Sequence, residues 1–330
     1  MVIWIQSYLK VIEMGTSMTA KFRKMLDNYR KKMIVAAGAH NPLFARIAEA
    51  VGFEAIYMSG GCTSMERIGW ADVNLITATE IIQNAKYITD VVNVPVIADA
   101  DNGYGNAINV MRTVRDYIRA GVAAIHIEDQ VMPKRCGMLK GKMVISMEEM
   151  IGKIKAAKKV IQDEDPNFVL IARTDARNAV GGGLDEAIKR MKAYGEAGAD
   201  VVFADAIGME KGKAEIERAV KEVGVPMLYH PSGVQPRLSL EECHEMGIAI
   251  VVYPGSSLEP AAIAVWDYLQ ELKKKGTQAQ IEFENKYKNH PLFGLKTLFN
   301  FTGYNKIQEY EKEFLPPEEV KLRYEKSIGL

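Results

Sequence analysis

Acidic residues follow two neighbouring apolar runs of this sequence, in positions where several side chains could act on one ligand. The run VPVIADAD places Asp99 and Asp101 two residues apart, and the run VAAIHIED ends in Glu128 and Asp129. Side chains two residues apart on a strand point to the same face, so Asp99 and Asp101 are predicted to share one space. Carboxylates this close repel one another unless a cation lies among them. An oxygen-rich set suits Mg²⁺, with Mn²⁺ as the alternative.

The acids also have a structural interpretation. Carboxylates at strand ends can cap the helices that follow, or they can form ion pairs with Arg173 and Lys134. Acidic residues outnumber these two cations, so some carboxylates are expected to stay unpaired and available to a metal.

A second chemical feature is the basic, glycine-bearing loop QVMPKRCGMLKGK (130–142). Cys136 lies beside Lys134 and Arg135, whose charges are expected to lower the pKa of its thiol and keep it reactive where it is exposed. Glycines such as Gly137 would let the loop close over a bound ligand. This context favours a functional cysteine over a buried structural one.

Eight short apolar runs alternate with helical patterns and must position these residues. The runs cover 33–39, 53–61, 94–103, 122–129, 168–175, 200–207, 225–233 and 248–256. Near-continuous apolar strands between helices predict a parallel sheet covered on both faces, and eight units predict a closed (β/α)₈ barrel. A Rossmann sheet is the alternative, but no G-x-G-x-x-G follows the first run.

In such a barrel the active site lies at the carboxyl ends of the strands. The residues that end the eight runs are therefore predicted to meet at one mouth: Tyr57, Ser59, Gly60, Gly61, Asp99, Asp101, His126, Glu128, Asp129, Arg173, Asp175, Asp205, His230 and Tyr253.

Two segments flank the barrel pattern. Residues 1–17 are interpreted as an N-terminal extension that is helical, and residues 18–330 as a single barrel domain. This domain includes a helical C-terminal segment, 258–330, which carries aromatic residues at helical spacing. The segment is expected to pack either on its own barrel or on a neighbouring subunit.

Composition narrows the class of protein. The chain has 330 residues, and its 42 lysines and arginines equal its 42 aspartates and glutamates, so no global field favours nucleic acid or a membrane surface. Three scattered cysteines indicate a reducing compartment, and Cys62 and Cys243 are expected to be buried. No stretch is long and apolar enough to span a bilayer, and no signal peptide is recognisable. A cytoplasmic location is expected.

The segments YMSGG, DADNGYG, HIEDQ, PKRCG and ARTDA together resemble the isocitrate lyase and phosphoenolpyruvate mutase superfamily, over residues 20–315. The PKRCG loop is similar to that of the lyase branch, which includes methylisocitrate lyase and dimethylmalate lyase. It is also similar to the loop of carboxyphosphonoenolpyruvate mutase. The resemblance implies a (β/α)₈ fold, and a homotetramer in which C-terminal helices cross between subunits.

The resemblance also implies roles for individual residues. Asp99 would bind Mg²⁺ directly, and the other metal-site acids would be Asp101, Glu128 and, in an outer position, Asp72. Tyr57 would help to remove a hydroxyl proton, Cys136 would return a proton to the leaving carbanion, and Arg173 would pair with a substrate carboxylate. The remaining substrate-binding positions would be Ser59, Gly60, Gly61, Gly137, Asp205 and His230.

Four positions depart from the lyase pattern. Met138 stands in place of histidine, Asp205 in place of glutamate, His230 in place of asparagine, and Glu259 in place of arginine. An anion where a carboxylate is usually clamped would repel a tricarboxylic acid. A smaller or less charged substrate is therefore expected.

The predicted function is Mg²⁺-dependent carbon–carbon bond cleavage of a substituted malate-type 2-hydroxy acid, which gives a 2-oxo acid of the pyruvate or glyoxylate type through an enolate. The alternatives on the same scaffold are oxaloacetate decarboxylation or hydrolysis, and phosphonomutase chemistry. A barrel that binds a small oxo acid without turning it over is an alternative of another class.

Overall fold

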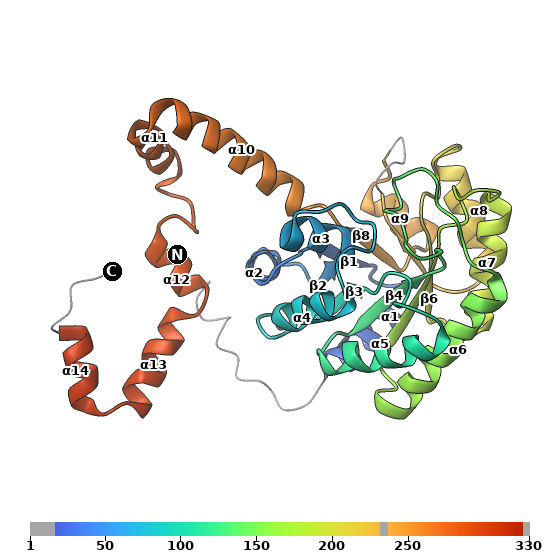
Figure 1. The fold of residues 1–330 in the computed structure, drawn as a ribbon, viewed down its shortest axis with the longest axis horizontal. Helices are drawn as coiled ribbons and strands as arrows, with labels where there is room; N and C mark the ends of the chain where they lie inside the picture. The colour runs from blue at the N-terminus through green and yellow to red at the C-terminus, as the bar shows by residue number, and fades with distance from the viewer. Residues whose placement is uncertain (1–16, 232–236, 326–330) are drawn as a thin grey trace. The chain divides into compact units, whose positions relative to one another are not determined.

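The computed structural model describes residues 17–231 and 237–325, and its barrel consists of eight parallel strands. The strands are β1 (Ile34–Gly38), β2 (Ala55–Met58), β3 (Val96–Asp99), β4 (Ala124–Glu128), β5 (Val169–Thr174), β6 (Val201–Ala204), β7 (Met227–Tyr229) and β8 (Ile250–Tyr253). They pair in sequence order, and β8 pairs with β1 to close the barrel (Figure 1). The predicted (β/α)₈ barrel is confirmed, with one strand in each apolar run.

Helices cover the outside of this barrel in the order that the sequence alternation predicts (Figure 1). They are α2 (Pro42–Ala50), α3 (Gly60–Ile68), α4 (Ala78–Thr89), α5 (Ala107–Arg119), α6 (Met147–Glu164), α7 (Leu184–Glu196), α8 (Lys213–Val223) and α9 (Leu240–Met246). Several have side-chain caps. Thr77 and Glu80, for example, form a capping box that satisfies free N–H groups at the start of α4. Local sequence therefore sets where these helices begin.

Helix α1 (Met18–Asp27) closes the amino-terminal end of the barrel. Phe22 and Leu26 are buried among the side chains that fill the barrel interior. Arg23 donates to the backbone oxygen of Phe168 at 2.9 Å and pairs with Asp200 at 2.9 Å, and both partners precede their strands. Helix α1 therefore covers the end of the barrel opposite the carboxyl ends of the strands.

Of the predicted N-terminal extension, residues 1–16 lie outside the described residues. Ser17 is the N-cap of α1 and accepts a hydrogen bond from the N–H of Ala20 at 3.1 Å. The helical nature of the extension stays a prediction.

The chain forms two compact units, Met1–Glu259 and Pro260–Leu330. The second unit contains most of α10 (Leu258–Lys275), and then α11 (Thr277–Tyr287), α12 (Leu295–Phe301), α13 (Tyr304–Phe314) and α14 (Pro317–Glu325). Large apolar side chains are exposed here, including Ile263, Trp266, Leu269, Phe283, Phe299 and Phe314. The predicted single domain from residue 18 to 330, and exchange of its C-terminal helices between subunits, stay predictions.

Across the part of the chain that the structure describes, no helix has both the length and the apolar character to cross a membrane.

Candidate active site

Asp99 and Asp101 lie side by side at the carboxyl end of β3. Oδ1 of Asp99 accepts a hydrogen bond from the N–H of Asp101 at 2.9 Å, and Oδ2 accepts one from the N–H of Gly60 at 3.0 Å. A Cβ atom at Gly60 would lie 2.9 Å from Oδ2 of Asp99 and 3.3 Å from Oδ1 of Asp101, so the carboxylates face a common space. Burial opposes ionisation of Asp99, but the neighbouring His126 and Lys134 lower its pKa to about 2. Asp99 is therefore ionised at neutral pH.

Ser59, Gly60 and Gly61 form the start of α3, directly after β2. Ser59 is the N-cap, and its Oγ accepts from the N–H of Cys62 at 3.3 Å. The free N–H groups of a first helical turn attract anions. One of these groups, that of Gly60, already donates to Asp99. That these three residues bind a substrate carboxylate stays a prediction.

Lys134 is a buried cation between two of the acids. Its Nζ pairs with Asp72, and with Oδ1 of Asp101 at 2.7 Å. Burial works to lower the pKa of this ammonium, but the carboxylates around it raise the pKa well above its usual value, so it stays charged. Burial raises the pKa of Asp101 to about 6 in spite of this partner. The ion pairs that the structural interpretation of the acids predicts are therefore present.

Arg173 reaches three carboxylates at the ends of β4, β5 and β6. Its Nε and Nη2 donate to the two oxygens of Asp175, at 2.9 Å each. Its Nε lies 3.2 Å from Oε2 of Glu128, and its Nη2 lies 3.5 Å from Oδ1 of Asp205. A substrate carboxylate would compete with these partners for the guanidinium.

Lys142 is a functional candidate that sequence reasoning missed. Its Nζ lies 2.7 Å from Oδ1 of Asp175, 2.7 Å from the backbone oxygen of Gly137 and 3.1 Å from Oδ2 of Asp205. Its side chain is completely buried. In the sequence Lys142 is only one more lysine in a basic loop. Its partners Asp175 and Asp205 lie more than 30 residues away along the chain, so no local pattern indicates these contacts.

Cys136 lies in the loop between β4 and α6 and is half-buried. Its N–H donates to the backbone oxygen of Asp72 at 3.0 Å, which holds it beside the acidic cluster. The prediction of a lowered thiol pKa is wrong: burial raises the pKa of Cys136, and the charge of Asp72 adds to this effect. The charge of Lys134 acts in the opposite direction and lowers the thiol pKa, but burial outweighs it. The thiol therefore keeps its proton at neutral pH, as a proton donor must.

Tyr57 and His126 form a buried pair inside the barrel mouth. The hydroxyl of Tyr57 lies 2.7 Å from Nε2 of His126, and the rings stack with centroids 5.7 Å apart. Nε2 also lies 3.5 Å from Oδ1 of Asp99. Burial lowers the pKa of His126 to about 4, and burial together with Asp99 raises the pKa of Tyr57, so both groups are neutral. The sequence predicts His126 at a strand end, and its contact with Tyr57 follows only from the packed barrel.

Asp205 and His230 follow β6 and β7. A Cβ atom at Gly137 would lie only 2.2 Å from Oδ2 of Asp205, so the Cys136 loop is in direct contact with this carboxylate. Burial lowers the pKa of the His230 imidazole to about 4, which makes the ring neutral at pH 7. The predicted substrate-binding roles of Gly137, Asp205 and His230 stay predictions, although Gly137 and Asp205 do lie together.

The predicted metal-site acids fit a divalent cation by charge and by donor type. Among the described residues, no group of three or more His, Cys, Asp and Glu side chains converges as a metal cluster, because cationic side chains lie between the acids. Even so, both carboxylate oxygens of Glu128 are buried without a hydrogen bond, and Oε1 has no ion pair in the described structure either. Three cations also face six carboxylates here: Lys134, Lys142 and Arg173 against Asp72, Asp99, Asp101, Glu128, Asp175 and Asp205. Burial raises the pKa of Glu128 well above its usual value, and Mg²⁺ with oxygen ligands would favour the ionised carboxylates.

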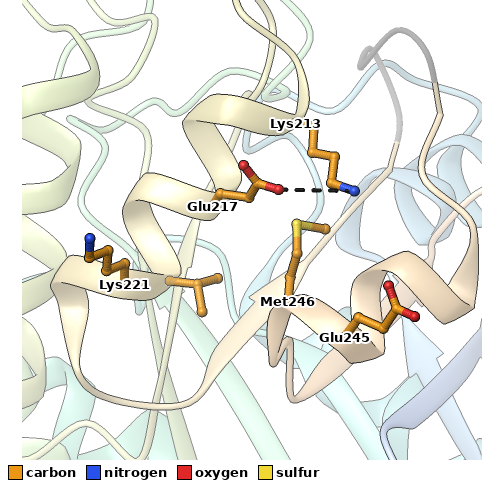
Figure 2. Close-up of a pocket in the computed structure, with 6 residues that line it drawn as sticks. Lys213, Glu217, Lys221, Glu245 and Met246 are labelled. Atoms are coloured by element: carbon orange, nitrogen blue, oxygen red, sulfur yellow. Dashed lines mark ion pairs between the residues drawn. The ribbon is translucent and has the colours of Figure 1, made fainter.

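Surface hollows lie elsewhere on the barrel. One, of about 340 Å³, lies between α8 and α9 and is lined by charged side chains; Figure 2 shows Lys213 and Glu217 pointing toward one another, 3.9 Å apart. Another, of about 500 Å³, is lined by residues of α4 and α5 and by Tyr104. Neither contains a predicted site residue, so the strand ends remain the candidate active site.

Comparison with known proteins identifies the superfamily and supports the fold. The family model described as phosphoenolpyruvate phosphomutase matches residues 22–273. The chain belongs to the PEP mutase/isocitrate lyase superfamily. It is 41% identical to a 2,3-dimethylmalate lyase from Eubacterium barkeri over 295 residues, which cover 89% of this chain and 94% of that enzyme. It is 42% identical to a 2-methylisocitrate lyase from Aeropyrum pernix over 254 residues, which cover 76% and 79% of the two chains.

Solved structures of this superfamily share the barrel. A crystal structure of 2,3-dimethylmalate lyase superposes with a TM-score of 0.84 at 32% identity, covering 96% of this chain and 100% of that one. Oxaloacetate acetylhydrolase bound to 3,3-difluorooxalacetate gives 0.80 at 33% identity, with 90% and 97% covered. Phosphonopyruvate hydrolase with oxalate and Mg²⁺ gives 0.80 at 30% identity, with 91% and 100% covered. The superfamily therefore contains lyases and hydrolases on this scaffold.

Proposed function

We propose that the chain is a Mg²⁺-dependent carbon–carbon lyase that cleaves a substituted malate-type 2-hydroxy acid. The products would be a 2-oxo acid of the pyruvate or glyoxylate type and a second carboxylic acid. The observation that carries this proposal is Cys136, a protonated thiol held beside the acidic cluster at the barrel mouth. Cleavage of a carbon–carbon bond leaves a carbanion or enolate that must be protonated, and a thiol with a raised pKa holds that proton ready. The similarity to 2,3-dimethylmalate lyase supports the same reaction class.

The chain's own residues divide the remaining work. Tyr57 would take the proton of the substrate hydroxyl as it passes its own phenolic proton to Nε2 of the neutral His126, its hydrogen-bond partner at 2.7 Å. Arg173 would orient a substrate carboxylate through its planar guanidinium. Asp99, Asp101, Glu128 and, in an outer position, Asp72 would hold Mg²⁺, or Mn²⁺ in its place. The metal supplies positive charge where oxygen atoms of the 2-oxo acid gain electron density.

Oxaloacetate hydrolysis or decarboxylation is the second candidate, supported by the structural similarity to oxaloacetate acetylhydrolase. Phosphonomutase chemistry is the third, supported by 37% identity over 259 residues to a carboxyvinyl-carboxyphosphonate phosphorylmutase from Arabidopsis thaliana. Phosphonomutase chemistry does not require the thiol of Cys136 as an acid, which favours the lyase over the mutase. Oxaloacetate hydrolysis also breaks a carbon–carbon bond, so the products must distinguish it from the lyase. A barrel that only binds an oxo acid would have no use for the proton-donating thiol.

Position 259 bears on the size of the substrate. Glu259 is exposed in α10, so water weakens the repulsion that it could exert on a second carboxylate. We infer a small malate-type substrate from Asp205 and His230 instead. Asp205 carries negative charge toward Arg173, and the neutral His230 adds no cation for a third carboxylate.

We also propose that the enzyme is a cytoplasmic homotetramer that binds neither nucleic acid nor membranes. Balanced charge and three cysteines without a disulfide between them support this location. Exposed apolar side chains along α10 to α13, such as Trp266 and Phe314, support association through the C-terminal helices. Sedimentation of the purified protein would measure the number of subunits.

The deciding experiment is product identification by mass spectrometry from a panel of 2-hydroxy and 2-oxo dicarboxylic acids with Mg²⁺. The panel includes alkyl-substituted malates, isocitrate, methylisocitrate and oxaloacetate. Pyruvate or glyoxylate released from a substituted malate supports the lyase. Oxalate and acetate from oxaloacetate would replace the proposal with the hydrolase, and no turnover of any compound would leave the binding-protein alternative.

A further inference from the structure

We propose that Lys142 is a positioning residue that fixes the loop bearing Cys136 against the ends of β5 and β6. The ammonium group has three hydrogens, and three acceptors lie around it: the backbone oxygen of Gly137, Oδ1 of Asp175 and Oδ2 of Asp205. These acceptors come from a loop and from two neighbouring strand ends. One side chain thus ties the residue next to Cys136 to the barrel.

The loop around Cys136 has little regular structure to hold it in place. Between Gln130 and Val144, which form an isolated antiparallel bridge, the described chain has no helix or strand. The side chain of Gln130 forms two hydrogen bonds with the backbone of Arg135, at 2.8 and 2.9 Å, and so fixes the first half of the loop, residues 130–135. Lys142 lies in the second half of the loop, and its side chain donates to the backbone oxygen of Gly137. This hydrogen bond closes the turn that contains Cys136.

Lys142 is itself held in place from outside the loop. The N–H of Val180 donates to the backbone oxygen of Lys142 at 3.0 Å, which connects the second half of the loop to the segment after β5. Its side chain is completely buried, so water does not compete for the ammonium. Both ends of the residue are therefore fixed, which makes it a rigid link.

The contact between Gly137 and Asp205 shows what the link maintains. The backbone of Gly137 approaches Asp205 and Arg173 so closely that a Cβ would lie 2.2 Å and 2.7 Å from their nearest atoms. Without the ammonium, two buried carboxylates and a carbonyl oxygen would face one another with Arg173 and the weakly placed Asn178 amide as remaining donors. Repulsion would move the loop outward and take the thiol of Cys136 with it.

Lys142 has no hydrogen bond to the Cys136 thiol and is therefore a positioning residue rather than a catalytic one. This role rests on the proposed function, in which Cys136 donates a proton. The test measures the thiol directly, so its result does not depend on finding the substrate.

The first arm is alkylation of Cys136 by iodoacetamide under native conditions, followed by mass spectrometry. Cys62 and Cys243 are buried and serve as internal references. Lys142→Met is expected to speed alkylation of Cys136 at least about tenfold, and Lys142→Arg to restore most of the slow rate. Lys140→Met removes an exposed lysine of the same loop and is expected to change nothing. A folded Lys142→Met protein with the wild-type alkylation rate would overturn the proposal.

The second arm uses activity. Misplacing a reacting group by about 1 Å costs roughly a hundredfold in rate, so Lys142→Met should lower kcat by about that factor with KM little changed. In a Cys136→Ser background the same substitution should have little further effect on kcat, whereas a general loss of structure would lower kcat equally in both backgrounds. If Lys142→Met does not fold, Lys142→Met with Asp205→Asn removes one of the uncompensated charges and allows the alkylation measurement, with Asp205→Asn alone as the reference. Absence of any lyase activity would disprove the proposed function, and the alkylation rates would still decide the role of Lys142.

Discussion

The backbone of Gly137 is in direct contact with the carboxylate of Asp205, which follows β6. A Cβ atom at position 137 would lie 2.2 Å from Oδ2 and 2.5 Å from Cγ of Asp205. Real Cβ atoms do not approach this closely, so the glycine is needed for space. Its φ is not positive, and an unusual backbone conformation is not the reason. This contact joins the cysteine loop to the acidic half of the site, and it leads to the first prediction.

Gly137→Ala should displace the loop and lower kcat by about a hundredfold, the effect expected for a reacting group moved by roughly 1 Å. Steady-state kinetics on the identified substrate would measure it. Gly152→Ala is the control, because a Cβ there meets nothing within 4 Å and alanine is favoured in a helix such as α6. Equal kcat values for Gly137→Ala and the wild type would show that the loop adapts.

Asp99→Ala should abolish Mg²⁺-dependent turnover and leave the fold intact. The substitution removes an ionised carboxylate and the acceptor for the N–H groups of Gly60 and Asp101. Mg²⁺ titration by calorimetry and circular dichroism would separate loss of the metal from loss of structure. Removal of Mg²⁺ from the wild-type enzyme by a chelator should have the same effect on turnover, reversed by added Mg²⁺. Undiminished turnover in the variant would disprove the metal assignment of Asp99.

Cys136→Ser should reduce cleavage by about two to four orders of magnitude, the usual contribution of general acid–base catalysis. A serine hydroxyl is a much weaker acid than a thiol and gives up its proton poorly. Rapid-quench measurement of the cleavage step would show the loss. Cys243→Ser, at a buried cysteine outside the site, is the control. A loss of less than about threefold would favour decarboxylation or mutase chemistry.

The raised thiol pKa predicts the form of the pH profile. An acid acts only while protonated, and burial moves ionisation of Cys136 above the usual value of 9.0. Activity that depends on this proton should therefore be retained through neutral pH and decline only above pH 9. The logarithm of kcat, measured from pH 6 to 10.5, should show this alkaline decline, and the residual activity of Cys136→Ser should lack it. A decline centred below pH 8 would contradict the raised pKa.

Phe22→Ala should lower the free energy of unfolding by about 3 to 5 kcal/mol, the usual cost of truncating a fully buried phenylalanine. Phe22 is 0% exposed and fills the amino-terminal end of the barrel, opposite the site. Denaturant unfolding would measure the change, with kcat of the remaining folded protein unaltered. Val51→Ala, at a residue 68% exposed, should change stability by less than about 0.5 kcal/mol. Equal stabilities for the two variants would show that α1 does not hold the barrel closed.

The sequence determined the barrel, because its strands and helices depend on local pattern. Each apolar run is long enough to specify a strand, and the alternation with helices allows few topologies. Asp99 ends β3, but Asp101 lies beyond the strand with a left-handed backbone (φ 46°), so the turn after β3, and not strand alternation, brings both carboxylates to the space near Gly60. The family motifs lie at the same strand ends.

The tertiary structure alone decided which charges meet, because ion pairs and burial depend on segments far apart in the chain. Lys142 joins Gly137 to Asp175 and Asp205, partners that no local pattern connects. Lys134, two residues before Cys136, pairs with Asp72 and Asp101, and its lowering effect on the thiol pKa is outweighed by burial. Sequence neighbours indicate which charges are available, and only the packed strand ends determine which of them a given group feels.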